Sequence, residues 1–255
     1  MSPLDETLVV GRHAVAAALA GRPELAQELL VAGGEKTPAV QAILQAARAA
    51  GVKVRRVEAA SLERLSGSAV HQGVALRLAA AGYAQAEDII AAAAAAGPAG
   101  LVLVADHIQD PQNLGALIRS AAAAGAQGLI MPKDRACPLT PVVTKAAAGA
   151  LAYLPVARVT NLSRALDRLK QAGLWVLAAA TRGAPPPWEL DLRLPLALVL
   201  GGEHKGVGQR LLAAADLTAS IPLAPGVESL NVSVAAGVLL FEVVRQRAGM
   251  DPSSK

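Results

Sequence analysis

Short apolar runs that alternate with helical stretches dominate the chain from residue 100 onward and constrain its fold most strongly. The expected strands are residues 101–104, 128–131, 154–159, 175–179 and 196–200. The expected helices between them are residues 114–124, 140–150 and 162–172. Strands that alternate with helices form a parallel sheet with helices on both faces. We therefore predict an α/β fold whose ligands bind in the loops that follow the carboxyl ends of the strands.

The first 80 residues predict a second, smaller α/β unit. Helical patterns cover residues 11–20, 38–50 and 61–65, and strand patterns lie within 25–31, 52–57 and 73–78. The Ala/Gly-rich stretch that follows predicts a boundary. We expect a small domain over 1–80, a linker over 81–98 that includes a short helix at 86–96, and a large domain over 99–255.

Basic residues outnumber acidic ones in the small domain, and this excess favours a surface that faces RNA. The basic residues are Arg12, Arg22, Lys53, Arg55, Arg56, Arg64 and Arg77. Charge alone fits an ordinary solvated surface equally well. The whole chain carries a net charge of +4, which permits an anionic partner. Aromatic residues make up only 2% of the chain and exclude base stacking as the main mode of binding.

Composition excludes several classes of protein. No apolar stretch reaches the roughly 18 residues of a membrane span, and residues 1–6 lack the basic start of a signal peptide. The single cysteine, Cys137, excludes an intrachain disulfide and indicates a reducing, cytoplasmic location. The four histidines lack the spacing of metal ligands, so we expect no metal site.

Near the end of the chain, a Pro/Gly-rich loop leads into a helix over 232–247 that has almost no polar face. Ser229 and Asn231 are both residue types that cap helix N-termini. A helix that is apolar all round must be buried on all sides. We therefore expect this helix to pack on the protein's own core and on a second subunit, which makes the protein a homodimer.

The glycine-rich loop after the strand at 196–200 does not match the known nucleotide-binding loops. Lys205 precedes Gly206 and no Ser or Thr follows where a Walker loop needs one. The loop is also unlike the dinucleotide fingerprint, and no Ser–His–Asp set or carboxylate pair has a supporting context. An ordinary tight turn explains this loop if it is considered alone.

Three segments together are more specific. DPQNLGALIRS at 110–120, LVLGGE at 198–203, and 221–235 with its IPL start and SLNVSVA end resemble, in this order, the three motifs of the knotted SPOUT-class RNA ribose methyltransferases. The residues around Gly11 and His71 are similar to a ribosomal-protein-L30-like domain that one branch of this family carries. That branch methylates a guanosine ribose in large-subunit ribosomal RNA.

The resemblance implies a fold and a cofactor that periodicity does not reveal. The carboxyl-terminal segment would thread a loop to form a trefoil knot, which ordinary topology rules hold to be essentially absent. S-adenosylmethionine would bind in a bent shape among the three knot loops. Gly201, Ile221 and Leu230 match positions that contact the cofactor through their backbone. Gly202 would let the main chain approach closely, and Thr181 is a weaker candidate.

The resemblance also implies a set of catalytic residues for methyl transfer to a ribose hydroxyl. Arg119 would bind an RNA phosphate or stabilise the developing oxyanion, because a guanidinium hardly deprotonates and makes a poor general base. Asn113 at the loop–helix junction can donate and accept. Glu203 would anchor Arg119 or Asn113, within the subunit or across the dimer. Ser229 and Asn231 would shape the pocket and orient the ribose. Taken singly, each residue also fits a structural role.

Two positions depart from the expected pattern or need an alternative. His204 stands where the family's second motif has a glycine, so its Cβ forces a different backbone angle or narrows the entrance. Lys205 beside it could instead meet RNA. Cys137 fits an incidental thiol better than a nucleophile, since sulfonium chemistry of this type needs none.

The leading interpretation is an S-adenosylmethionine-dependent guanosine 2′-O-methyltransferase acting on 23S ribosomal RNA. One alternative is a 2′-O-methyltransferase of the same fold that acts on transfer RNA or another ribosomal RNA site. The other is a catalytically silent RNA-binding protein. The presence of the small domain argues against the transfer-RNA branch. The complete set of motif residues argues against a catalytically silent protein.

Overall fold

The computed structural model describes residues 6–21, 23–34, 37–66, 71–79, 82–202 and 206–249. The chain divides into two compact units. The small unit comprises Met1–Gly82 together with Ala148–Tyr153, and the large unit comprises Tyr83–Ala147 and Leu154–Lys255. We describe each unit by itself.

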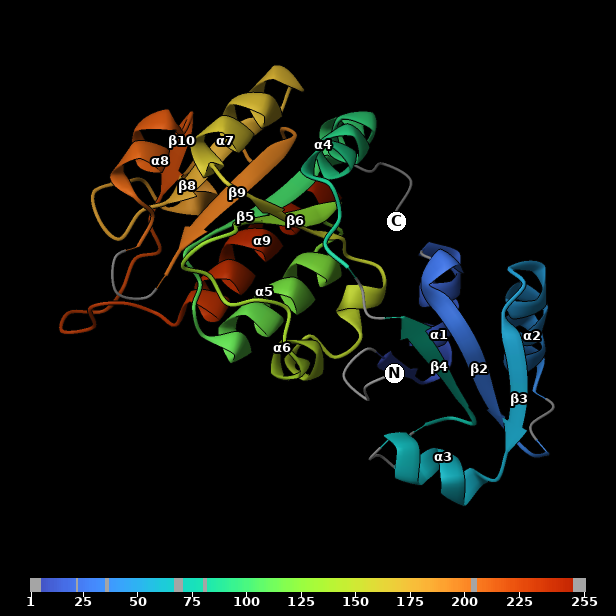
Figure 1. Ribbon diagram of the computed structural model, residues 1–255. Helices are drawn as coiled ribbons and strands as arrows, with labels where there is room; N and C mark the ends of the chain where they lie inside the picture. The colour runs from blue at the N-terminus through green and yellow to red at the C-terminus, as the bar shows by residue number, and fades with distance from the viewer. Residues whose placement is uncertain are drawn as a thin grey trace. The chain divides into compact units, whose positions relative to one another are not determined.

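The small unit is a four-stranded sheet with helices on both faces (Figure 1). Its elements are β1 (Glu6–Val10), α1 (Arg12–Gly21), β2 (Ala26–Ala32), α2 (Pro38–Ala49), β3 (Lys53–Val57), α3 (Ala59–Ser66) and β4 (Val74–Ala79), with a 3-10 turn at Pro23–Leu25. The strand order is β1-β4-β2-β3. Only β2 and β3 run parallel; β4 is antiparallel to both β1 and β2. The expected mixed α/β unit is confirmed.

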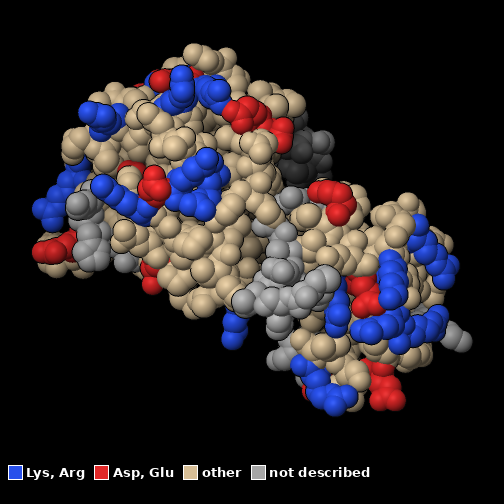
Figure 2. Space-filling model, viewed as in Figure 1, with Lys and Arg blue, Asp and Glu red and all other residues tan. Residues whose placement is uncertain are grey.

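The two faces of this small sheet bury different amounts of apolar side-chain surface. Alternate residues such as Leu29 and Val31 pack on α1 and α2, and Leu30 and Ala32 point to the other face, where Leu62 of α3 covers them. Beyond α3, that second face carries charged side chains, which Figure 2 shows gathered over β2 and β3. There Glu28 is ion-paired with Lys53, Arg55 and Arg77 at 3.5–3.8 Å. An RNA-facing role for the basic residues stays a prediction, and Arg22 lies outside the described residues.

The large unit contains a six-stranded sheet in which every described pairing is parallel. The strand order is β10-β8-β9-β5-β6-β7. The strands are β5 (Leu101–Asp106), β6 (Gly128–Pro132), β7 (Val156–Val159), β8 (Trp175–Ala179), β9 (Leu196–Gly201) and β10 (Leu217–Ala219). Because β9 inserts between β8 and β5, the last third of the chain returns to the centre of the sheet.

Helices cover both faces of this sheet, as predicted (Figure 1). One face carries α4 (Ala86–Ala95), α7 (Leu162–Gln171) and α8 (Gln209–Ala214), which share one core with the strands. The other face carries α5 (Pro111–Ala123), α6 (Pro141–Ala146) and α9 (Val232–Ala248), with α5 packed against both α6 and α9. The short 3-10 turns of this part of the chain are Gly97–Ala99, Ala150–Ala152 and Pro187–Glu189. The α/β class and the parallel sheet are confirmed, and the knot stays a prediction.

Two expectations about boundaries need correction. The short helix expected at 86–96 is present as α4, but its Ile89 and Ala93 are buried in the core of the large unit, so this part of the segment 81–98 is not a free linker. The helix expected over 140–150 ends at Ala146, because Ala148 and Gly149 take left-handed backbone angles of +49° and +87°. The chain then makes its turn at Ala150–Ala152, and Ala152 is buried in the core of the small unit.

The motif at 110–120 begins a helix one turn earlier than expected. Asp110 is the N-cap, and its carboxylate accepts from the backbone N–H of Asn113 at 2.8 Å. Pro111 follows at the first helical position, where a missing N–H costs nothing. Gly115 lets α5 approach α6, because a Cβ there would collide with Ala146.

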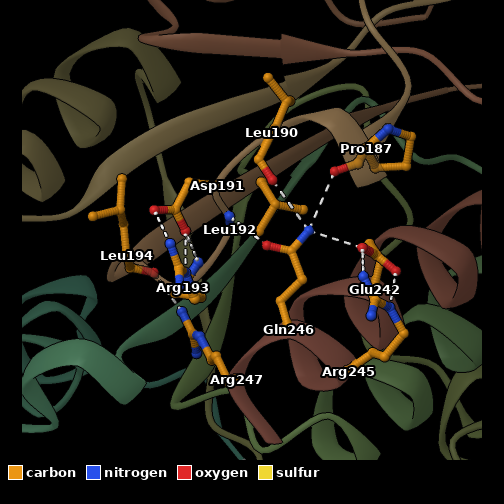
Figure 3. A network of polar contacts seen from close by, with 10 residues as sticks. All are labelled: Pro187, Leu190, Asp191, Leu192, Arg193, Leu194, Glu242, Arg245, Gln246 and Arg247. Carbon is orange, nitrogen blue, oxygen red and sulfur yellow. Dashed lines mark hydrogen bonds and ion pairs between the residues drawn. The ribbon is translucent and has the colours of Figure 1, made fainter. Parts of the chain in front are cut away.

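The last turn of α9 is fastened to the large unit by two half-buried polar side chains, Gln246 and Arg247 (Figure 3). Gln246 donates to the carbonyls of Pro187 and Leu190 and accepts from the backbone N–H of Leu192. Arg247 donates to the carbonyls of Ala99, Gly100 and Leu194 at 2.6–3.0 Å. These bonds tie α9 to the segments that precede β5 and β9.

We predict that Arg247→Met lowers the free energy of unfolding by about 2–4 kcal/mol, because three carbonyls of the fold lose their donor. Denaturant unfolding of the two proteins measures the difference. The matched control is Arg245→Met on the same helix, since Arg245 is exposed and its ion pair within the described residues is with Glu242 of the same helix. Its expected cost is below about 1 kcal/mol. Equal costs for the two variants would contradict the role assigned to Arg247.

Candidate active site

A cavity of about 450 Å³ opens at the carboxyl edge of the large unit's sheet. Its walls come from the ends of β8, β9 and β10 and from the loop that leads into α9. All five residues predicted to bind the cofactor line this cavity: Thr181, Gly201, Gly202, Ile221 and Leu230. Ser229 lines it as well. Residues of the second and third motifs therefore meet at this cavity, whereas no residue of the motif at 110–120 lines it.

The glycines of the second motif are required by close backbone contacts. A Cβ on Gly201 would overlap the backbone of Gly206 and Val207. A Cβ on Gly202 would lie 2.9 Å from the carbonyl oxygen of His107. The loop also closes on itself, because the Gly206 N–H donates to the Gly202 carbonyl at 2.8 Å. Any side chain at either glycine would push the loop out of this arrangement.

The rest of the cavity combines aliphatic walls with a few polar residues. Leu200, Val232 and Leu239 supply buried aliphatic surface. Leu223 and Glu228, which the sequence did not single out, also line the cavity. A cleft of this size with apolar walls and a few polar groups is typical of a small-molecule site.

A second hollow adjoins this cavity and contains Asn113. The two share the walls Gly202, Gly206 and Val232. Asn113 is buried, and its side-chain oxygen accepts from Nδ2 of Asn231 at 2.9 Å. The first and third motifs thus meet in a direct amide–amide hydrogen bond. We call this space the amide hollow.

Asn231 also begins α9. Its side-chain oxygen accepts from the backbone N–H of Ser233 at 2.8 Å and from the Ser233 hydroxyl at 2.6 Å. Ser229, expected as a second capping residue, lies in the loop before the helix and faces the cofactor cavity instead.

The sequence did not single out Asp106, the buried carboxylate at the end of β5. Its Oδ2 accepts from the Gly208 N–H at 2.9 Å, and its Oδ1 bonds to Nδ1 of His107. The main chain of Asp106 also accepts from the Gly202 N–H at 3.0 Å. This residue therefore fastens the glycine loop to the end of β5. The sequence feature that could have indicated Asp106 is its position directly after an apolar run of the strand.

Arg119 lies apart from both cavities. It is an exposed residue of α5, and within the described part of the chain it makes no hydrogen bond or ion pair. The chain therefore does not bring Arg119 together with Asn113 in a single site. Glu203, His204 and Lys205 lie outside the described residues, so their expected roles stay predictions.

Cys137 is a buried thiol next to the loop that follows β5. Its Sγ bonds to the Pro138 carbonyl at 3.3 Å. Burial raises the pKa of this thiol, and the negative charge of Asp110 raises it further. A nucleophilic cysteine needs a lowered pKa. This environment therefore favours the interpretation of Cys137 as an incidental thiol over a catalytic nucleophile.

Two negative findings concern the described residues alone. Among them, no group of three His, Cys, Asp or Glu side chains could hold a metal ion. None of their helices is both long and apolar enough to cross a bilayer.

Comparisons with known proteins agree with this geometry. The SpoU rRNA Methylase family matches residues 100–241. A family described as RNA 2′-O ribose methyltransferase substrate binding matches residues 8–84.

Two curated relatives align with almost the whole chain. The 23S rRNA (guanosine-2′-O-)-methyltransferase RlmB of Xanthomonas axonopodis is 42% identical, over 94% of this chain and 97% of its own length. The putative TrmH family tRNA/rRNA methyltransferase YacO of Bacillus subtilis is 38% identical over 94% and 95%.

Solved structures show the same fold. An AdoMet-bound rRNA methyltransferase from Sinorhizobium meliloti superimposes with a TM-score of 0.68 at 26% identity, covering 94% of this chain and 87% of that one. The SpoU methyltransferase AviRb from Streptomyces viridochromogenes, in complex with AdoMet, gives 0.69 at 25% identity over 96% and 92%.

The amide hollow is lined by residues of all three motifs, and the motifs are carried by a parallel sheet. Together with a family match over more than half of the residues, these observations lead to one assignment. The chain belongs to the SpoU rRNA methylase family.

Proposed function

We propose that this protein transfers a methyl group from S-adenosylmethionine to the ribose 2′-hydroxyl of a guanosine in 23S ribosomal RNA. The relatives that align over nearly their full length and have this activity support the substrate. The observation that carries the proposal is the convergence of Gly201, Ile221 and Leu230 on a cavity that adjoins the Asn113–Asn231 pair. A cytoplasmic location fits this substrate and the lone cysteine.

The cavity fits the cofactor on its own geometry. Gly201 and Gly202 line the cavity without side chains, so bound adenosine could lie against the main chain there. Leu200, Leu230 and Leu239 would surround its apolar parts. When bound, the cofactor's sulfonium supplies an electrophilic methyl group. Its positive charge is lost in the transfer, which a water-poor cavity does not oppose.

The amide hollow is where we place the target ribose. Asn113 and Asn231 fix each other's amide groups, so a sugar that enters the hollow meets donors and acceptors already oriented. Asp106 keeps the wall between the hollow and the cofactor cavity in place through Gly208. The chain's own part in the reaction is to align the 2′-oxygen with the methyl group and to exclude water.

The charge that forms on the 2′-oxygen needs a cation, and we assign this role to Arg119 of a second copy of the chain. Val234, Val238 and Phe241 follow one face of α9 and are 40–51% exposed. Their spacing forms a single apolar stripe. Exposed aliphatic and aromatic side chains in such a row mark a protein–protein contact. Because α5 packs against α9, a second copy docked on this stripe would bring its Arg119 close to the amide hollow of the first copy.

Mapping of ribose methylation in 23S ribosomal RNA tests the proposed function directly. A strain that lacks the gene should lose one methylated guanosine and regain it when the intact gene is returned. Primer extension at low nucleotide concentration locates the methylated ribose. Unchanged ribose methylation in the deletion strain would refute the proposal.

We predict that Gly201→Ala weakens S-adenosylmethionine binding tenfold or more, because the new Cβ collides with the Gly206 backbone at a cost of about 1–3 kcal/mol. Calorimetry measures the affinity. The control is Gly82→Ala, since a Cβ at Gly82 meets only open space. Equal affinities in the Gly201 variant and the unsubstituted protein would show that the cofactor binds elsewhere.

We predict that Arg119→Ala lowers the methylation rate about a hundredfold or more, as loss of one oxyanion-stabilising group does, and leaves S-adenosylmethionine affinity unchanged. Single-turnover assays separate the rate from binding. A dimer that joins one Arg119→Ala chain to one Gly201→Ala chain should recover about half the activity per dimer. It would then hold one complete site, made from the intact pocket of one chain and the intact arginine of the other.

Tagging the two chains differently allows this mixed dimer to be purified away from both parents. The assay uses an S-adenosylmethionine concentration well below the dissociation constant of the Gly201→Ala pocket, so that each parent has little activity. A mixed dimer as inactive as its parents would place Arg119 in the same subunit's site, and a normal rate in Arg119→Ala would remove Arg119 from the reaction.

A further inference from the structure

Three hollows follow one another along the carboxyl edge of the large unit's sheet. The first is the amide hollow, which shares Asp106, His107 and Arg135 with the second. The second shares Thr160 and Asn161 with the third. Their volumes are about 650, 580 and 270 Å³. Because neighbours share walls, the hollows form a groove that begins beside the cofactor cavity and ends between α4 and α7.

The far end of this groove is strongly basic. Lys133, Arg158, Arg164 and Arg168 line the third hollow, and Glu87 is its only carboxylate. Arg168 is ion-paired with Glu87. Across the described residues, the side chains of Lys133 and Arg164 take part in no ion pair, and both are exposed. The third hollow therefore keeps three positive charges without a matching acid.

Arg158 is held rigidly in this hollow. Its guanidinium lies over the ring of Tyr83, 4.9 Å from the centroid, and donates to the Lys133 carbonyl. The Tyr83 hydroxyl in turn accepts from the Leu139 N–H at 2.9 Å. The Nε of Arg158 is buried and has no hydrogen-bond partner within the described residues. A guanidinium fixed in this way loses little entropy when it binds an anion.

The start of α7 adds to the positive potential of the same hollow. Asn161 caps this helix, with its Oδ1 accepting from the Arg164 N–H at 3.1 Å. The first N–H groups of a helix carry partial positive charge and favour anions. Between this end and the amide hollow, the groove walls are largely polar, with Thr160 and Asn161 at the junction.

We propose that this groove carries the RNA strand that flanks the methylated ribose, and that Lys133, Arg158 and Arg164 hold its backbone phosphates. The proposal rests on the proposed function, because it needs the target ribose in the amide hollow. An RNA strand bears one negative charge per nucleotide, so the strand leaving that hollow meets fixed cations at the groove's end. The chain's few aromatic residues leave phosphate contacts as its main means of binding.

The test uses the full-length protein and labelled hairpins of 23S ribosomal RNA that contain the mapped nucleotide. Lys133→Ala and Arg164→Ala are combined, because both side chains are exposed and their removal leaves the core intact. Fluorescence anisotropy over a range of salt concentrations gives affinity and salt dependence. We expect about hundredfold weaker binding, roughly tenfold for each charge-assisted contact. In single strands each phosphate contact contributes about 0.7 to the slope of log affinity against log salt. Loss of two contacts should therefore reduce the steepness of this slope by about 1.4.

Shortening the hairpin one nucleotide at a time locates the contact. Once the contacted phosphates are removed, the two proteins should bind with equal affinity, and the double variant, which keeps only Arg158 of the three cations, should lose less affinity on trimming than the unsubstituted protein. S-adenosylmethionine affinity should be the same in both proteins. Arg164→Lys, which keeps the charge, should recover part of the loss.

Arg210→Ala is the control for net charge, since Arg210 is an exposed residue of α8 outside these hollows. It should change affinity less than threefold. If the double variant binds RNA with unchanged affinity and slope, or weakens no more than Arg210→Ala, the groove does not carry the strand. That result leaves the proposed function standing, because methylation by the unsubstituted protein is measured separately in the deletion strain.

Discussion

The buried carboxylate of Asp106 is the interaction on which the site's geometry depends. A carboxylate that is 3% exposed is costly unless its oxygens are bonded. Here one oxygen accepts from the Gly208 N–H and the other from His107. The glycine loop after β9 is thereby tied to the end of β5. That loop is the common wall of the cofactor cavity and the amide hollow, so both cavities take their shape from one anchored segment.

Much of the fold could be predicted from sequence because the large unit's strands are buried on both faces. Such strands are continuously apolar, and five of its six were expected within one or two residues of their observed bounds. The exception, β10, is only Leu217–Ala219, too short to produce a pattern. The helix α6 ends at Ala146, before the expected end at residue 150, for a local reason that amino-acid composition does not reveal. Ala148 adopts a left-handed angle that no propensity assigns to alanine.

The site divides in the same way. Gly201, Ile221 and Leu230 could be placed together because they occupy motif positions that resemble a known family, and all three line the same cavity. Asp106 was missed because its partner Gly208 lies 102 residues away, and no pattern links the two. Arg119 and Asn113 were both expected to act in the reaction, but Arg119 is exposed while Asn113 is buried on the same helix. Residues six apart on a helix point in different directions, so a single chain cannot supply both groups to one point.

This division suggests different demands on the two halves of the site. The methyl donor's cavity is made from backbone and aliphatic walls that one folded chain completes. The groups that we propose meet RNA are exposed side chains, Arg119, Lys133 and Arg164, which can be substituted without harm to the fold. Specificity for a particular RNA could therefore diverge while the cofactor cavity stays the same.

The position of the cavity in the chain also bears on synthesis. Its walls run from Ala179 to Leu239, and the last of them lies on the helix that Gln246 and Arg247 fasten down. A nascent chain that has emerged only as far as β8 has most of its strands but none of the glycine loop or the final helix. Such a chain cannot hold the methyl donor, so an unfinished polypeptide on the ribosome stays inert toward the RNA around it.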